Sequence, residues 1–211
     1  MKLNALLTTL VLIGFNVQAQ EKLELNYDGF FDRMDDIESA EYQGVKLAFY
    51  LKDKNGVPCA VKQAKLTTKI KQQDVYVLES GEILLPYEPL LDQDKAILVI
   101  DKADNKECGL NMSLESNLLF EQQVPKQQAL QLTNTFDAAF DDLGGMMSFM
   151  LPKVKGITFK FKQGVEGKLL NSSIANCNIE KGCTVLKEEL EQIETDLTFS
   201  HKPVKVVPYI Q

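Results

Sequence analysis

Apolar and polar residues alternate along the first part of the chain, which is the pattern of half-buried β-strands. The clearest case is residues 45–52, where Val45, Leu47, Phe49 and Leu51 alternate with Lys46, Ala48, Tyr50 and Lys52. Further strands are predicted at residues 23–27, 57–61, 66–70, 75–78, 83–85, 96–100 and 108–114. The run at 96–100 is continuously apolar and predicts a well-buried strand. About seven short strands separated by turns, such as the Asn-Gly turn at 53–56, predict a sandwich or small barrel.

Apolar residues recur at helical spacing in three other segments. Residues 28–37 predict a helix that Asp28 can cap, with Phe30, Phe31, Met34 and Ile37 on one face. A longer helix follows Pro125, and Gly144-Gly145 either kinks it or ends it. The rest of the chain predicts a strand at 157–161, a polar turn-rich segment at 163–182, a helix at 186–195, and strands at 197–199 and 204–207. Pro203 and Pro208 are expected to bound the last strand.

The fold class is therefore α+β, with a β-rich, sandwich-like or barrel-like N-terminal part and a smaller α+β C-terminal part. The change of pattern at Pro125 predicts parts at residues 20–124 and 125–211, either as separate domains or packed as one unit.

Residues 1–19 have the pattern of a cleavable export signal. Lys2 supplies the positive charge, residues 5–15 are apolar, and Val17-Gln18-Ala19 fits the cleavage rule, so the mature chain would begin at Gln20. The alternative is a membrane anchor, but a spanning helix needs about 20 apolar residues and this run is shorter. No other stretch is long and apolar enough, so no membrane span is expected after cleavage. The predicted location is the periplasm, or the medium if the protein is not retained.

The charge of the chain argues against nucleic-acid binding. Its 23 Lys and Arg against 30 Asp and Glu give a formal net charge of −7, without a basic stripe. A hydrophobic content of 45% is typical of a globular protein.

Four cysteines in an exported chain favour disulfides. Of the three possible pairings we favour Cys59 with Cys108 and Cys177 with Cys183, since each pair lies within one predicted segment. The alternative is a metal site, but the chain has one histidine, His201, and its cysteines lack the spacing of a zinc site. We therefore expect no metal and no cofactor.

Several short motifs resemble those of a known family. These are residues 27–33 (YDGFFDR), 45–51 (VKLAFYL) with Cys59, 84–86 (LLP), 141–145 (DDLGG) and 202–210 (KPVKVVPYI). Together they resemble an uncharacterised family, a domain of unknown function, of exported proteins from marine gamma-proteobacteria. The resemblance implies an address in the Gram-negative envelope and brings no activity or functional residues.

Catalytic motifs are not evident in the sequence. His201 follows Ser200 in a segment expected to be an exposed turn, and no Gly-x-Ser-x-Gly elbow occurs. Carboxylate pairs could serve glycoside hydrolysis, but in so acidic a chain they more often form solvated surfaces. These are Asp35-Asp36, Asp141-Asp142, and Glu82 with Glu88. A calcium loop at Asp101, Asp104, Asn105 and Glu107 lacks the EF-hand pattern. Neither Gly144-Gly145 nor residues 164–167 (GVEG) match a phosphate loop.

Two apolar clusters have both a binding and a structural interpretation. One is Phe30-Phe31, and the other comprises Met146, Met147, Phe149, Met150 and Leu151. Flexible methionines suit adaptable binding surfaces, although burial in the core is the simpler role.

The sequence thus favours an exported envelope protein that acts as a non-catalytic binding or adaptor module for a protein, a peptide or a glycan. The first alternative is a hydrolase of envelope polymers with an atypical carboxylate site. The second is a structural module without a ligand.

Overall fold

The computed structural model describes residues 22–104, 106–145 and 150–211. The expected export signal, with its cleavage point after Ala19, lies outside these residues. The described residues also exclude Asn105 of the calcium-loop hypothesis, and Met146, Met147 and Phe149 of the apolar cluster.

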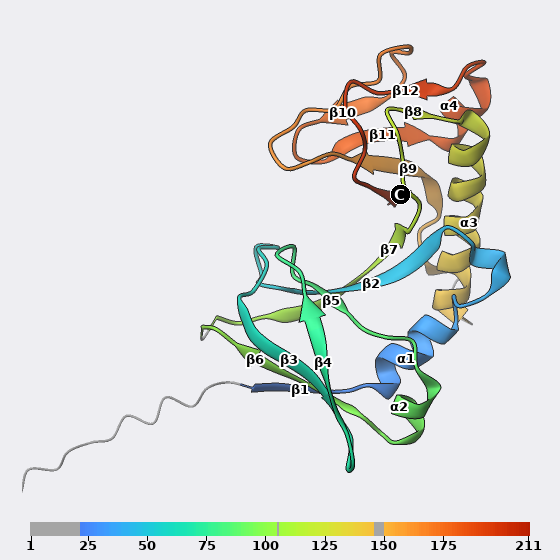
Figure 1. Ribbon diagram of the computed structural model, residues 1–211. Helices are drawn as coiled ribbons and strands as arrows, with labels where there is room; N and C mark the ends of the chain where they lie inside the picture. The colour runs from blue at the N-terminus through green and yellow to red at the C-terminus, as the bar shows by residue number, and fades with distance from the viewer. Residues whose placement is uncertain (1–21, 105, 146–149) are drawn as a thin grey trace, which may run out of the picture.

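Residues 22–116 form one antiparallel sheet of seven strands in the order β1-β6-β3-β4-β5-β2-β7. The strands are β1 (Lys22–Asn26), β2 (Val45–Lys52), β3 (Val61–Thr67), β4 (Gln72–Val77), β5 (Glu82–Leu84), β6 (Ile97–Lys102) and β7 (Gly109–Ser116). The sheet curls into an open half-barrel that leaves β1 and β7 as its two edges (Figure 1). This confirms a β-rich, barrel-like architecture. The apolar residues of the inner face pack together, as where Ala64 of β3 lies between Ile100 and Val75.

Two strand predictions in this sheet are wrong. The chain does not break between residues 61 and 66, because β3 spans this interval, from the end of one predicted strand to the start of the next, and ends at Thr67. The Thr68 hydroxyl accepts hydrogen bonds from the N–H groups of Ile70 and Lys71, and this turn leaves Ile70 88% exposed. Strand β6 is half-buried rather than fully buried. Leu98 and Ile100 face the core, and Ile97 lies on the outer face.

Strand β2 is more buried than its sequence pattern predicts. Its alternation predicts one wet face, yet Ala48 and Tyr50 are as buried as Phe49 and Leu51. At Tyr50 the outer face is covered by Lys205, from the C-terminal strand, which donates to the Tyr50 hydroxyl.

A second antiparallel sheet has four strands in the order β10-β11-β9-β13. Its strands are β9 (Val154–Lys160), β10 (Asn176–Asn178), β11 (Gly182–Leu186) and β13 (Lys205–Ile210). Pro208 does not end the last strand but lies inside β13, opposite Ile157. A proline is tolerated there because β13 is an edge strand, which can present a position without an N–H group to its unpaired side. A short pair, β8 (Gln123–Val124) with β12 (Leu197–Thr198), adjoins this sheet.

One helix packs against both sheets. Helix α3 (Lys126–Gly144) runs along one side of both (Figure 1), and its buried residues belong to the same apolar cluster as those of the sheets. It begins after Pro125 as predicted, where the Lys126 N–H donates to Asp196 Oδ1 at 3.1 Å. It ends rather than kinks at the glycine pair, because Gly145 adopts a φ of +52° that favours glycine. Within the described ranges, no helix is both long and apolar enough to cross a membrane.

The shorter helices are α1 (Asp28–Asp35), a 3-10 turn η1 (Ala40–Tyr42), α2 (Pro89–Gln93) and α4 (Lys187–Gln192). Tyr27, and not Asp28, occupies the cap position of α1. The Tyr27 side chain is fully buried and its hydroxyl donates to the Pro86 carbonyl at 2.6 Å, which fixes where the helix begins.

Candidate functional site

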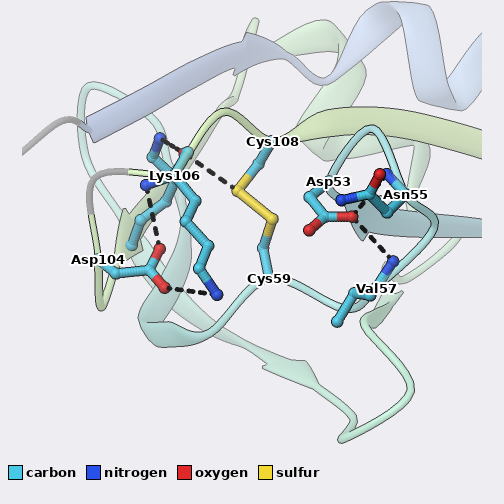
Figure 2. Close-up of a disulfide and its surroundings, with 8 residues drawn as sticks. Asp53, Asn55, Val57, Cys59, Asp104, Lys106 and Cys108 are labelled. Atoms are coloured by element: carbon cyan, nitrogen blue, oxygen red, sulfur yellow. Dashed lines mark hydrogen bonds and ion pairs between the residues drawn. A yellow bond between two sulfur atoms is a disulfide. The ribbon is translucent and has the colours of Figure 1, made fainter.

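The four cysteines lie in the two pairs that the sequence favours. Cys59 and Cys108 are joined with Cα atoms 6.3 Å apart, and Cys177 and Cys183 with Cα atoms 3.9 Å apart. Figure 2 shows the first pair between two polar turns, one built by Asp53 and the other by Asp104. The second pair crosses the hairpin of β10 and β11. Both bridges hold loops near the ends of strands, so we assign them a structural role.

A cleft of about 760 Å³ opens where the two sheets meet. Strands β2 and β7 form one side, β9 and β13 the other, and the C-terminal end of α3 closes one end. Because β7 is an edge strand, residues from both of its faces line the cleft, as Met112 and Leu114 from one face and Asn111 and Glu115 from the other. This volume is within the range of sites that bind small molecules.

A polar group of three residues, of which Tyr50 and Glu115 are buried, lines the cleft. The Tyr50 hydroxyl donates to Glu115 Oε1 at 2.7 Å, and the Lys205 ammonium lies 2.9 Å from each oxygen of the Glu115 carboxylate. Lys205 also donates to the Tyr50 hydroxyl. Burial, followed by the bond to Glu115, raises the pKa of Tyr50. Tyr50 is 3% exposed and Glu115 is 2% exposed, so the carboxylate depends on these two partners for its compensation.

Two further lysines line the cleft. The Lys52 ammonium lies 4.3 Å from the centre of the Tyr50 ring. Lys160 of β9 stands directly opposite Lys205 of β13, and burial together with the charge of Lys205 lowers the pKa of Lys160. No described carboxylate contacts Lys160. The cleft therefore has three cationic side chains and one carboxylate, in a protein whose overall charge is negative.

The rest of the lining is largely apolar. It comprises Leu47, Leu114, Phe140, Leu143, Phe161 and Val207, with others at the rim. Apolar walls with a few charged groups are typical of sites that hold a ligand in a fixed orientation.

The structure brings Ser200 and His201 into contact but does not place them in a cleft. The Ser200 hydroxyl lies 3.0 Å from His201 Nδ1 on the exposed surface, and it accepts a hydrogen bond from the Lys168 N–H. The residues are neighbours in sequence, and their contact does not form the triad arrangement of a serine hydrolase.

The carboxylate pairs are separated by their partners. Tyr87 donates to Asp35, whereas Asp36 pairs with Arg33. Likewise, Lys153 pairs with Asp141 at 2.7 Å, whereas Tyr42 donates to Asp142. The hydrogen bonds to these carboxylates raise the pKa of Tyr42 and of Tyr87 to about 12 each.

Three of the remaining candidate carboxylates also form ion pairs. Glu82 pairs with Lys46 at 2.5 Å, and Glu88 lies 3.9 Å from Lys71. Asp104 binds Lys106, and Asp101 lies in β6 rather than in a loop. Within the described part of the chain, no three His, Cys, Asp or Glu side chains gather as metal ligands would.

The apolar clusters are resolved in part. Phe30 is buried edge-on against Phe49, and Phe31 stacks on Tyr87, so this pair contributes to packing. Of the methionine cluster, Leu151 lines the cleft and Met150 is 66% exposed.

Sequence reasoning missed the residues that form the cleft. The alternation of apolar and polar residues assigns Tyr50, Lys160 and Lys205 to the solvent-exposed faces of their strands. Glu115 follows the apolar positions of β7. The one available signal was the large aromatic Tyr50 on a face otherwise assigned to solvent.

A comparison with family models matches residues 19–161 to a family described as "Protein of unknown function (DUF2987)". Neither the curated proteins nor the solved structures yielded a match to this chain. The matched residues include the whole half-barrel, α3 and β9, although the C-terminal motif at 202–210 lies beyond them. Because the match covers more than half of the sequence, the chain belongs to the DUF2987 family of proteins of unknown function.

Proposed function

We propose that this protein is an exported, non-catalytic binding module of the gamma-proteobacterial envelope, and that its ligand occupies the cleft between the two sheets. The observation that carries the proposal is a cleft of about 760 Å³ with apolar walls and three lysines. Its single lining carboxylate, Glu115, is neutralised by Lys205. A cleft of this kind is organised to recognise a ligand.

Binding is favoured over polymer hydrolysis by the state of the carboxylates. Hydrolysis by two carboxylates requires them to flank one bond at about 5 to 9.5 Å from each other. In each adjacent pair, the two side chains bind different partners. Glu115 has no second carboxylate beside it among the residues that line the cleft.

The periplasm is the compartment that we propose. The support is the export signal expected at residues 1–19 together with two disulfides, since disulfides persist in oxidising compartments. The intact mass of the protein from the envelope fraction should correspond to a chain that begins at Gln20 and lacks four hydrogens. A chain that retains residues 1–19, or that contains four free thiols, would contradict export.

Photo-crosslinking in living cells tests the binding function. A photoreactive amino acid at Met112, which is half exposed at the cleft, should capture the ligand. The same group at Ile70, in the exposed turn after β3, is the matched control. We expect a reproducible adduct, identified by mass spectrometry, at Met112 and not at Ile70. Equal capture at both positions, or none at either, would refute the proposed site.

A further inference from the structure

Lys160 and Lys205 form a like-charged pair in which Glu115 compensates Lys205 alone. They are directly opposite on β9 and β13, so their side chains leave the sheet on the same face. Like charges in this position destabilise a sheet. Both side chains line the cleft, so the repulsion between them acts there.

The charges within the cleft do not balance. Glu115 compensates Lys205, and the Tyr50 hydroxyl completes that group. Lys160 and Lys52 remain as cations with no carboxylate partner among the described residues. An anion bound beside Lys160 would relieve its repulsion from Lys205 and would supply the missing charge.

The rest of the cleft lining indicates what kind of molecule carries the anionic group. Apolar surface is offered by Leu47, Leu114, Phe140, Leu143 and Val207. The uncharged polar side chains of the lining are Tyr50, Asn111 and Ser113. A sugar or a long peptide brings many polar groups, which would lose their hydrogen bonds to water against such walls. An alkyl chain brings none, and each CH₂ group that it buries against these walls favours binding.

Building on the proposed binding function, we propose that the cleft binds a single-chain anionic amphiphile, namely a fatty acid. Its carboxylate lies between Lys160 and Lys205, within reach of Lys52, and its alkyl chain lies along the apolar wall formed by α3, β2 and β7.

Calorimetric titration of the full disulfide-bonded protein with decanoate, below its micellar concentration, tests this inference. Decanoate should bind, 1-decanol should bind at least tenfold more weakly because it lacks the charge, and acetate should show no binding because it lacks the chain. Lys160→Gln should weaken decanoate binding about tenfold. Lys155→Gln, at an exposed position of the same strand, should leave it unchanged.

A folding readout separates recognition from damage. Without ligand, Lys160→Gln should melt at the same temperature as the wild type or higher, since it removes the repulsion from Lys205.

Equal binding of decanoate and 1-decanol, or equal loss of decanoate binding in the Lys155 and Lys160 variants, would overturn the inference. So would a lack of decanoate binding. If decanoate fails while Met112 captures a peptide in cells, the fatty-acid assignment falls and the binding function stands. If decanoate does not bind and Met112 captures nothing in cells, both the fatty-acid assignment and the binding function are refuted.

Discussion

At the residue scale, Lys205 joins the two sheets through polar contacts in a cleft whose lining is largely apolar. Its ammonium compensates Glu115 and hydrogen-bonds to Tyr50, and both of these partners belong to the half-barrel. Removing one partner of a buried ion pair leaves the other charge without compensation, which costs more free energy than the pair itself contributes.

Lys205→Met should therefore lower the free energy of unfolding by about 2 to 3 kcal/mol, less than for a fully buried pair because Lys205 is partly exposed. Lys202→Met is the matched control, because its partner Glu121 lies on the surface, and it should cost less than about 1 kcal/mol. Urea unfolding of both variants measures the difference. Similar small losses would mean that Glu115 is not held by Lys205.

The tyrosines predict how stability depends on pH. The pKa values of Tyr27, Tyr42, Tyr50 and Tyr87 are all raised in the fold, those of Tyr42 and Tyr87 to about 12. Phenols of the unfolded chain lose their protons near pH 10. The stabilisation is therefore complete below about pH 10 and is lost as the pH rises towards 12.

Urea midpoints at pH 8, 10 and 11 should show this loss, and Tyr42→Phe should reduce the slope above pH 10. A midpoint that stays constant to pH 11 would contradict the raised pKa values.

At the scale of elements, the two disulfides close loops of very different length. The Cys59–Cys108 bridge spans 49 residues and ties the segment before β3 to the start of β7, an edge of the cleft. The Cys177–Cys183 bridge spans 6 residues within one hairpin. In the chain-entropy model the long loop contributes about 4 kcal/mol and the short loop about 2 kcal/mol.

Replacing both Cys59 and Cys108 by serine should therefore destabilise the protein more than replacing both Cys177 and Cys183. The comparison of urea midpoints checks this order. Equal losses would show that loop length does not determine the contribution of these bridges.

On the scale of the whole molecule, the core residues of both sheets and of α3 form one continuous cluster. We therefore expect residues 20–124 and 125–211 to unfold together. Because the chain lacks tryptophan, Tyr76→Trp in β4 and Tyr209→Trp in β13 can report on each sheet separately. Their urea midpoints should coincide. Two separated transitions would instead support two independent domains.

The local features of this molecule were predictable and the site was not. The strand at 45–52, the turn at Gly56 and the start of α3 at Pro125 follow from residues within a few positions of each other. Tyr50 and Lys205, in contrast, are 155 positions apart and meet only because β13 packs against β7, the neighbour of β2. Alternation indicates which positions share a face, but it does not indicate what covers that face.

The central claim is that the cleft between the sheets is the ligand site. Amide chemical-shift mapping by NMR during a decanoate titration tests it most directly. We predict that the perturbed residues surround the cleft, centred on Lys160, Lys205 and Met112. Perturbations centred on the outer face of β3 and β4, or spread evenly over the surface, would contradict the account.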